Sequence, residues 1–167
     1  MLNWFESLIP YLNTYNYGTE QFKVAEVEVS YKTDYKVQER PQINSSDDAY
    51  RILLQHWKLG SIELLEEFKV ILLNTNNRVL GIVDISVGGV SGTLVDPRII
   101  FAIALKTNSS KIILAHNHPS GNIQPSNADL KIAQKLKEGG KLLEIEVCDH
   151  IIVTSNTYYS FADECMM

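Results

Sequence analysis

Cysteine is scarce in this sequence, and its scarcity excludes several kinds of site. Cys148 and Cys165 are the only cysteines among 167 residues, and they do not form a CxxC pair. A disulfide framework, a thiolate zinc site and a thioredoxin-like motif all need more cysteines or closer ones. A zinc nucleobase deaminase is excluded too, because its signature contains PCxxC. We therefore expect two free thiols, with Cys148 as a small core residue.

Long apolar runs are also missing. The apolar runs are only a few residues long, whereas a transmembrane helix needs roughly 20 apolar residues. The first residues lack the basic region and the long apolar core of a secretory signal. We therefore expect a cytoplasmic protein that has no membrane partner.

An excess of positive charge is absent, which argues against nucleic acid as the main partner. The sequence has 15 lysines and arginines against 20 acidic residues, which gives a net charge of −5, and it contains no dense basic stripe. Proteins that follow a phosphate backbone carry such stripes. DNA therefore remains only a secondary alternative.

The composition is that of a folded chain, with 45% hydrophobic and 21% charged residues. A chain of 167 residues can bury enough apolar surface to fold as one domain without disulfides. Residues 1–20 mix aromatic side chains with asparagine and glycine and show no clear periodicity, so we predict an N-terminal extension there. We predict one domain over residues 21–167, which begins with a half-buried strand over 23–31.

The order of periodic segments predicts a mixed sheet flanked by helices. Helical spacing and capping residues predict helices from Ser45 or Ser46 to about Lys58, from Asp96 and Pro97 to about Asn108, and from Ser126 to the pair Gly139 and Gly140. Short β-branched runs predict strands over 68–73, 78–86, 111–115, 142–147 and 151–154, and in the SNTYYSF segment. The first two of these should form a well-buried hairpin at the centre of the sheet. This order is typical of an α/β (α+β) domain with three layers.

Two histidines and an aspartate stand out after the 111–115 strand. His116 and His118 alternate, so an extended chain can point both imidazoles to one side. Proline and glycine residues follow and can turn the chain back, which would let Asp129, near the start of the next helix, face the histidines. Two histidines and one carboxylate are a common ligand set for catalytic zinc. A polar turn with a helix-capping aspartate is the competing interpretation, and it is the better one for an isolated HxH pair.

The longer pattern resembles a known zinc motif. His116 and His118 are followed, after seven further residues, by Ser126 and then by Asp129. This spacing resembles the JAMM motif of JAB/MPN-domain zinc metalloproteases, and the segments HNHPSG and PSxxD resemble the RadC branch of that family. The resemblance extends over roughly residues 40–167, in segments such as EEFKVILLNTNNRVLG and DHIIV. It is a resemblance to a short form, without the N-terminal helix-hairpin-helix region of longer RadC proteins.

The resemblance implies a fold, a cofactor and a reaction. The fold would be the three-layer JAB/MPN domain, which is cytidine-deaminase-like and has a mixed central sheet with flanking helices. His116, His118 and Asp129 would ligate one Zn²⁺. Glu66, in preference to the adjacent Glu67, would be the general base that activates a zinc-bound water for attack on an amide carbonyl of a peptide or protein substrate.

Four other polar residues complete the predicted surroundings of the site. Ser126 would stabilise the oxyanion by a hydrogen bond, and it would also cap its helix. Asn117 stands where the motif usually has serine or threonine, and we expect it not to affect ligation. Asp149 and His150 form an acid and imidazole pair, for which a supporting role is favoured over zinc ligation.

Two other functions are kept as alternatives. A non-catalytic MPN-type scaffold would share the fold, although every motif position is filled here. A DNA repair-associated protein is suggested by the RadC label, against the acidic charge and the lack of a helix-hairpin-helix region. The sequence carries no signal for the oligomeric state.

Overall fold

The described part of the protein contains three α-helices and five strands. The computed structural model describes residues 31, 33, 36–58, 60–89 and 92–167. The elements, in chain order, are the 3-10 helix η1 (Val37–Glu39), α2 (Ser46–His56), β1 (Glu67–Leu73), β2 (Val79–Val87), α3 (Pro97–Lys106), β3 (Lys111–Asn117), α4 (Asn127–Leu142), β4 (Glu146–Val153) and β5 (Tyr158–Ser160). The predicted extension over 1–20, and all of the predicted 23–31 strand except Tyr31, lie outside the described residues.

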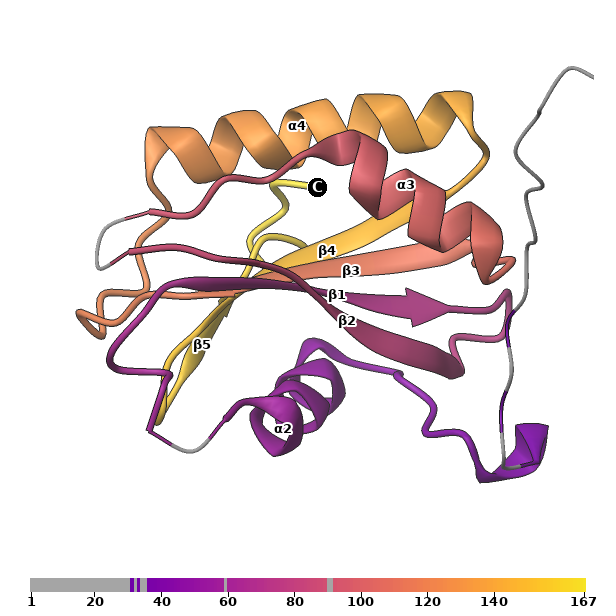
Figure 1. Ribbon diagram of the computed structural model, residues 1–167, viewed down its shortest axis with the longest axis horizontal. Coiled ribbons are helices and arrows are strands. Elements are labelled where there is room, and N and C mark those ends of the chain that lie inside the picture. Colours follow the sequence, from indigo (N-terminus) through magenta and orange to yellow (C-terminus); the bar gives the residue numbers. More distant parts are fainter. Residues whose placement is uncertain (1–30, 32, 34–35, 59, 90–91) are drawn as a thin grey trace, which may run out of the picture.

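The five strands form one sheet between two helical layers. Figure 1 shows α3 and α4 over one face of the sheet and α2 over the other. The predicted three-layer α/β architecture is therefore confirmed. No helix within the described ranges combines the length and the apolar character needed to cross a bilayer.

The strand order in the sheet is β2-β1-β3-β4-β5. β3 pairs with β4 in parallel, and the other neighbouring strands are antiparallel. The predicted hairpin of β1 and β2 is present, but the prediction that it forms the centre was wrong, because β2 is an edge strand and β3 is central. Every residue of β1 is buried, whereas β2 is only partly buried and exposes Asp84 and Val87.

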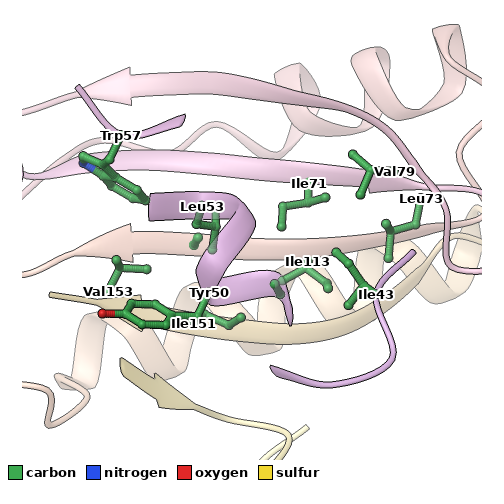
Figure 2. Close-up of a cluster of buried hydrophobic side chains, with 12 residues drawn as sticks. Ile43, Tyr50, Leu53, Trp57, Ile71, Leu73, Val79, Ile113, Ile151 and Val153 are labelled. Atoms are coloured by element: carbon green, nitrogen blue, oxygen red, sulfur yellow. The ribbon is translucent and has the colours of Figure 1, made fainter. Parts of the chain in front are cut away.

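The face of the sheet under α2 carries one apolar core (Figure 2). Ser45 caps the helix by accepting a hydrogen bond from the Asp48 N–H, and the first turn then leads into an apolar helix face. Tyr50, Leu53 and Trp57 of this face are buried against the sheet. The strands contribute Ile71, Leu73, Val79, Ile113, Ala115, Ile151 and Val153.

The opposite face carries a second core, under α3 and α4. The strands contribute Phe68, Val70, Leu72, Leu80, Ile112, Leu114 and Val147, and the helices contribute Ile100, Phe101, Ala104 and Leu136. Successive side chains of a strand point to opposite faces. His116 therefore follows Ile112 and Leu114 on the face of α4, and Asn117 follows Ile113 and Ala115 on the face of α2.

α4 continues through Gly139 and Gly140 to Leu142, so the prediction that this pair ends the helix was wrong. A Cβ at Gly140 would lie 2.4 Å from the Ile145 carbonyl oxygen, and a Cβ at Gly139 would lie 2.9 Å from the Phe101 ring. The two glycines thus permit close packing of the helix on its neighbours. This packing outweighs their unfavourable helix propensity of about 1 kcal/mol each.

One continuous strand, β4, replaces the two strands predicted over 142–147 and 151–154. Leu142 still belongs to α4, and Glu144 has a φ of 56°, so the chain is turning where the first of these strands was expected to begin. The strand begins at Glu146. Asp149 and His150 lie within this strand, next to β3, so the prediction that the pair belongs to a strand is confirmed.

Candidate metal centre

His116 and His118 lie at the carboxyl end of the central strand. His116 belongs to β3 and is 1% exposed, on the face covered by α4. The strand ends at Asn117, and a turn follows in which the Gly121 N–H donates to the His118 carbonyl oxygen. Gly121 has a φ of 75°, a conformation that glycine adopts without strain. The turn leads the chain from the sheet towards the start of α4.

Asp129 reaches the histidines from the first turn of α4. Ser126 Oγ accepts a hydrogen bond from the Asp129 N–H at 3.2 Å, and Asp129 Oδ2 accepts one from the Ser126 N–H at 2.7 Å. This reciprocal capping box fixes the carboxylate at the helix N-terminus, where the helix dipole favours negative charge. The predicted cap of this helix is therefore confirmed.

The ligand atoms of these three residues lie together. His116 Nε2 is 3.0 Å from His118 Nε2 and 3.2 Å from Asp129 Oδ1, and His118 Nε2 is 3.7 Å from Asp129 Oδ2. Ligand atoms bound tetrahedrally at the distances usual for zinc are about 3.3 Å apart. The contacts of His116 with His118 and with Asp129 Oδ1 are close to this spacing, and one ligand atom from each of the three residues lies within 4.8 Å of the others. The described part of the chain contains no other cluster of three potential ligands.

The Nδ1 atom of each imidazole makes a hydrogen bond, which helps to keep Nε2 available for a metal ion. His118 Nδ1 lies 2.5 Å from the Asn122 carbonyl oxygen, and it must be the donor because a carbonyl oxygen only accepts. In the neutral imidazole, His118 Nε2 then carries the lone pair. His116 Nδ1 lies 2.8 Å from His150 Nε2. When His116 is the donor in this pair, its Nε2 also presents a lone pair to the centre.

His150 therefore contacts the centre without belonging to the ligand cluster. Its ring is fully buried, with ring centroids 5.7 Å from Phe68 and 4.8 Å from Phe161. Burial lowers the pKa of His150 well below its usual value, and the nearby His116 lowers it further. The ring thus stays neutral, and its Nε2 atom can accept a hydrogen bond from His116 Nδ1. Alternation from Ile151 and Val153 could have placed His150 on this face, but a register irregularity between Val147 and Asp149 breaks the alternation from the start of β4. Only the pairing of β3 with β4 brings His150 to His116.

Asp149 supports the fold around its neighbour. Its carboxylate accepts hydrogen bonds from the Ser160 hydroxyl at 2.6 Å and from the Ala162 N–H at 2.9 Å. These bonds fix the segment after β4 to the sheet. The contacts of Asp149 and His150 agree with the supporting role predicted for this pair.

The electrostatics of the cluster suit a cation. Burial raises the pKa of Asp129, but hydrogen bonds from His116 and His118 outweigh it and hold that pKa well below its usual range. The hydrogen bond to Asp129 raises the pKa of His118, against the opposing effect of burial. A carboxylate held ionised beside two imidazoles is a donor set in which a divalent ion can replace a proton.

Glu66 lines the same cavity as the ligand cluster, and Glu67 does not. The cavity has a volume of about 550 Å³, and its walls include Glu66, His116, His118, Ser126 and Asp129. Glu67 begins β1 and carries its carboxylate 2.8 Å from the Nζ of the buried Lys69. Burial raises the pKa of Glu67, but the hydrogen bond from Lys69 contributes to a net shift downwards. Glu67 is thus engaged in a buried ion pair, which leaves Glu66 as the carboxylate beside the cluster.

A larger cavity of about 680 Å³ lies at the end of α4 and the start of β4. Its walls include lysines, glutamates and Cys148, but no histidine. Burial raises the pKa of the Cys148 thiol to about 11, and a thiol with so high a pKa is a poor nucleophile. The cavity beside Asp129 is therefore distinguished by the chemistry of the residues that line it, and not by its volume.

Comparisons with known proteins agree on one family. The family model described as a RadC-like JAB domain matches residues 43–166. A UPF0758 protein of Alkaliphilus metalliredigens is 44% identical over 126 residues, which are 75% of this chain and 53% of the relative. A UPF0758 protein of Flavobacterium johnsoniae is 42% identical over 123 residues, which are 74% of this chain and 52% of the relative. A UPF0758 protein of Chlorobaculum parvum is 34% identical over 152 residues, which are 90% and 68% of the two chains.

The matched region contains the whole of the described centre, from Glu66 to His150. The chain spans about half the length of the first two of these relatives. The names of these relatives state no activity.

Proposed function

This chain belongs to the RadC-like JAB domain family, and we propose that it is a zinc-dependent hydrolase that cleaves an amide bond of a peptide or protein, as a metallopeptidase or an isopeptidase. One observation carries the proposal. The ligand atoms of His116, His118 and Asp129 lie together at a cavity whose walls also include Glu66 and Ser126. Such a set offers a metal site, a proton acceptor and a hydrogen-bond donor.

The donor set fits zinc. Two imidazole nitrogens and one carboxylate oxygen suit zinc, whereas magnesium and calcium prefer oxygen ligands throughout. The distances of 3.0 Å from His116 Nε2 to His118 Nε2 and 3.2 Å from His116 Nε2 to Asp129 Oδ1 are close to the value of about 3.3 Å for tetrahedral zinc. His118 Nε2 lies 3.7 Å from the other carboxylate oxygen of Asp129. When bound, zinc would lower the pKa of water to about 7 and polarise the carbonyl group of the substrate.

Glu66 would move the proton. Its side chain is half-buried and lines the cavity, and it does not belong to the ligand cluster. A carboxylate within about 3 Å of a water can take a proton from it and return that proton to the leaving amine. Glu66 would therefore act first as general base and then as general acid.

Ser126 would stabilise negative charge on the carbonyl oxygen of the substrate. Its Oγ accepts a hydrogen bond from the Asp129 N–H, which leaves the hydroxyl proton for a second partner. A donor to an oxyanion contributes roughly 2.7 to 4 kcal/mol to transition-state stabilisation. The capping role and the oxyanion role use different parts of the hydroxyl group, so both can operate together.

Metal analysis of the purified protein tests the ligands. We expect about one zinc per wild-type chain. Loss of a residue that only supports a ligand weakens metal binding by up to about 100-fold. Because His118 would itself be a ligand, His118→Ala should weaken zinc binding by more than this. His56→Ala is the matched control, because His56 is exposed and bonds the Ile52 carbonyl oxygen of its own helix. Full zinc retention by His118→Ala would contradict the ligand assignment.

Measurement of hydrolysis rates with a peptide library tests whether Glu66 is the general base. Glu66→Gln should keep its zinc and lose roughly 100- to 10,000-fold in hydrolysis rate, the usual contribution of general acid and base catalysis. Glu63→Gln is the control, because Glu63 is an exposed glutamate of the same segment that bonds Ser155. Equal rates for Glu66→Gln and wild type would remove Glu66 from the mechanism and favour a non-catalytic scaffold.

A further inference from the structure

Asn117 lies between the two histidines in sequence but on the other face of the sheet. Because side chains alternate along β3, His116 lies on the face of α4 and Asn117 on the face of α2. The Asn117 side chain is completely buried, at 0% exposure. A buried amide is costly unless its polar atoms are bonded. The partners of this amide therefore indicate what the residue does.

All three of its hydrogen bonds go to the backbone of one segment. Asn117 Oδ1 accepts from the Glu67 N–H at 2.7 Å, and Nδ2 donates to the carbonyl oxygens of Ile62 at 2.7 Å and Leu65 at 2.8 Å. Both N–H groups and the oxygen are used, so the amide has a single orientation. The bonded groups lie on both sides of Glu66.

The segment that carries Glu66 has no helix or strand to hold it. Residues 60–66 precede β1 and lie outside every α-helix and strand. The Glu66 N–H donates to the Gly89 carbonyl oxygen at 3.1 Å, and the Gly88 N–H donates to the Glu66 carbonyl oxygen at 2.8 Å. Glu66 is thus held between the loop after β2 and the strand that carries the metal ligands.

We propose that Asn117 is a positioning residue, which holds the backbone of residues 62–67, and through it the Glu66 carboxylate, in a fixed place relative to His116 and His118. The inference rests on the proposed function, in which Glu66 is the base. Asn117 and the two histidines are consecutive residues, so the strand that orients the metal ligands also carries the group that holds the base. A displacement of about 1 Å between reacting groups can cost on the order of 100-fold in rate.

Two substitutions remove these bonds to different extents. Aspartate has the shape of asparagine but no N–H group, so Asn117→Asp keeps the bond from Glu67 and sets a carboxylate oxygen against two carbonyl oxygens. Asn117→Ala removes all three bonds. Asn74→Ala is the matched control, because Asn74 Oδ1 accepts from the N–H groups of Asn76 and Arg78 in the turn at the opposite end of β1.

Hydrogen exchange of the zinc-loaded full chain, followed by mass spectrometry, tests the contact itself. In Asn117→Ala and Asn117→Asp, the amides of residues 62–67 should exchange at least about 10-fold faster, while one zinc per chain is retained. Asn74→Ala should leave this segment unchanged. Wild-type exchange in both variants would overturn the proposal. Loss of zinc with faster exchange throughout β3 and β4 would also overturn it, because that result indicates a general role in the core.

Kinetics test whether Asn117 acts through Glu66. The substrate is a peptide found by the library profiling. In the wild-type background, Asn117→Ala should lower kcat by about 100-fold with little change in KM. In a Glu66→Gln background, the same substitution should change kcat only a little, because the base is already absent. An equal loss in both backgrounds, or an unchanged kcat despite faster exchange, would overturn the proposal. The exchange and zinc measurements need no substrate, so they remain decisive even if the proposed hydrolase activity is absent.

Discussion

The second ring nitrogen of His116 contacts another imidazole. Ligand histidines usually donate their second N–H to a carboxylate, a carbonyl oxygen or water. Here the partner of His116 Nδ1 is His150 Nε2, at 2.8 Å, in a ring that burial keeps neutral. The His150 Nδ1 atom is buried and bonds nothing within the described residues. A neutral acceptor adds no negative charge, so Asp129 is the one anionic residue of the cluster.

Removal of this partner should weaken zinc binding although every ligand remains. We expect His150→Ala to lower zinc affinity by about 10- to 100-fold, the range for partners that orient a ligand. A competition titration against a zinc chelator measures the effect, with His56→Ala as the control. His150→Gln, which keeps an acceptor, should lose less than His150→Ala. Wild-type affinity in His150→Ala would show that His116 does not need this contact.

Residues whose contacts lie close along the chain were easier to predict than residues whose contacts are far away in the sequence. His116, His118 and Asp129 lie within 14 residues, and strand alternation and helix capping are local rules that place them. His150 contacts a residue 34 positions away, and Asn117 contacts one 50 positions away. Alternation shows that Asn117 and His116 face opposite sides, but no local pattern shows what covers each side.

Two adjacent glycines after β2 offer a paired test of the loop that holds Glu66. A Cβ at Gly88 would lie 2.1 Å from the Gly92 carbonyl oxygen, whereas a Cβ at Gly89 would meet nothing within 4 Å. Gly88→Ala should therefore displace the loop, lower the free energy of unfolding by about 1–3 kcal/mol and reduce hydrolysis. Gly89→Ala should stay near wild type. Chemical denaturation measures the difference, and equal stability of the two variants would contradict this description of the loop.

Helix starts were easier to predict than helix ends. The starts of α2, α3 and α4 follow from capping residues, which act within one turn. Gly139 does not end α4, because its lack of a Cβ lets the Phe101 ring approach, which is a tertiary contact. The helix ends at Leu142, after which Glu144 has a φ of 56° and the Ile145 N–H donates to the Gly140 carbonyl oxygen. The edge position of β2 likewise depends on long-range pairing, because β3 pairs with the other side of β1. The apolar sequences of β1 and β2 do not show which of the two strands pairs with β3.

Zinc should stabilise the whole domain, because its ligands come from a central strand and from a helix of a different layer. At 100 times its Kd, a ligand that binds only the folded state adds about 2.7 kcal/mol. For a domain of this size, each kcal/mol shifts Tm by about 2–4 °C, so removal of zinc by a chelator should lower Tm by about 5–10 °C. Thermal unfolding with and without chelator measures this shift. His118→Ala should not respond, and an unchanged wild-type Tm would contradict the metal site.

The two halves of the centre have different entropic costs of assembly. The turn between β3 and α4 closes a short loop that brings Asp129 to His116, whereas the contact of Asn117 with the Glu67 N–H closes a loop of 50 residues. The cost of closure rises with the logarithm of loop length, so the longer loop costs about 1 kcal/mol more. In a folding chain the proposed metal ligands can therefore meet at a lower entropic cost than the proposed base, whose place depends on the completed pairing of β1 with β3.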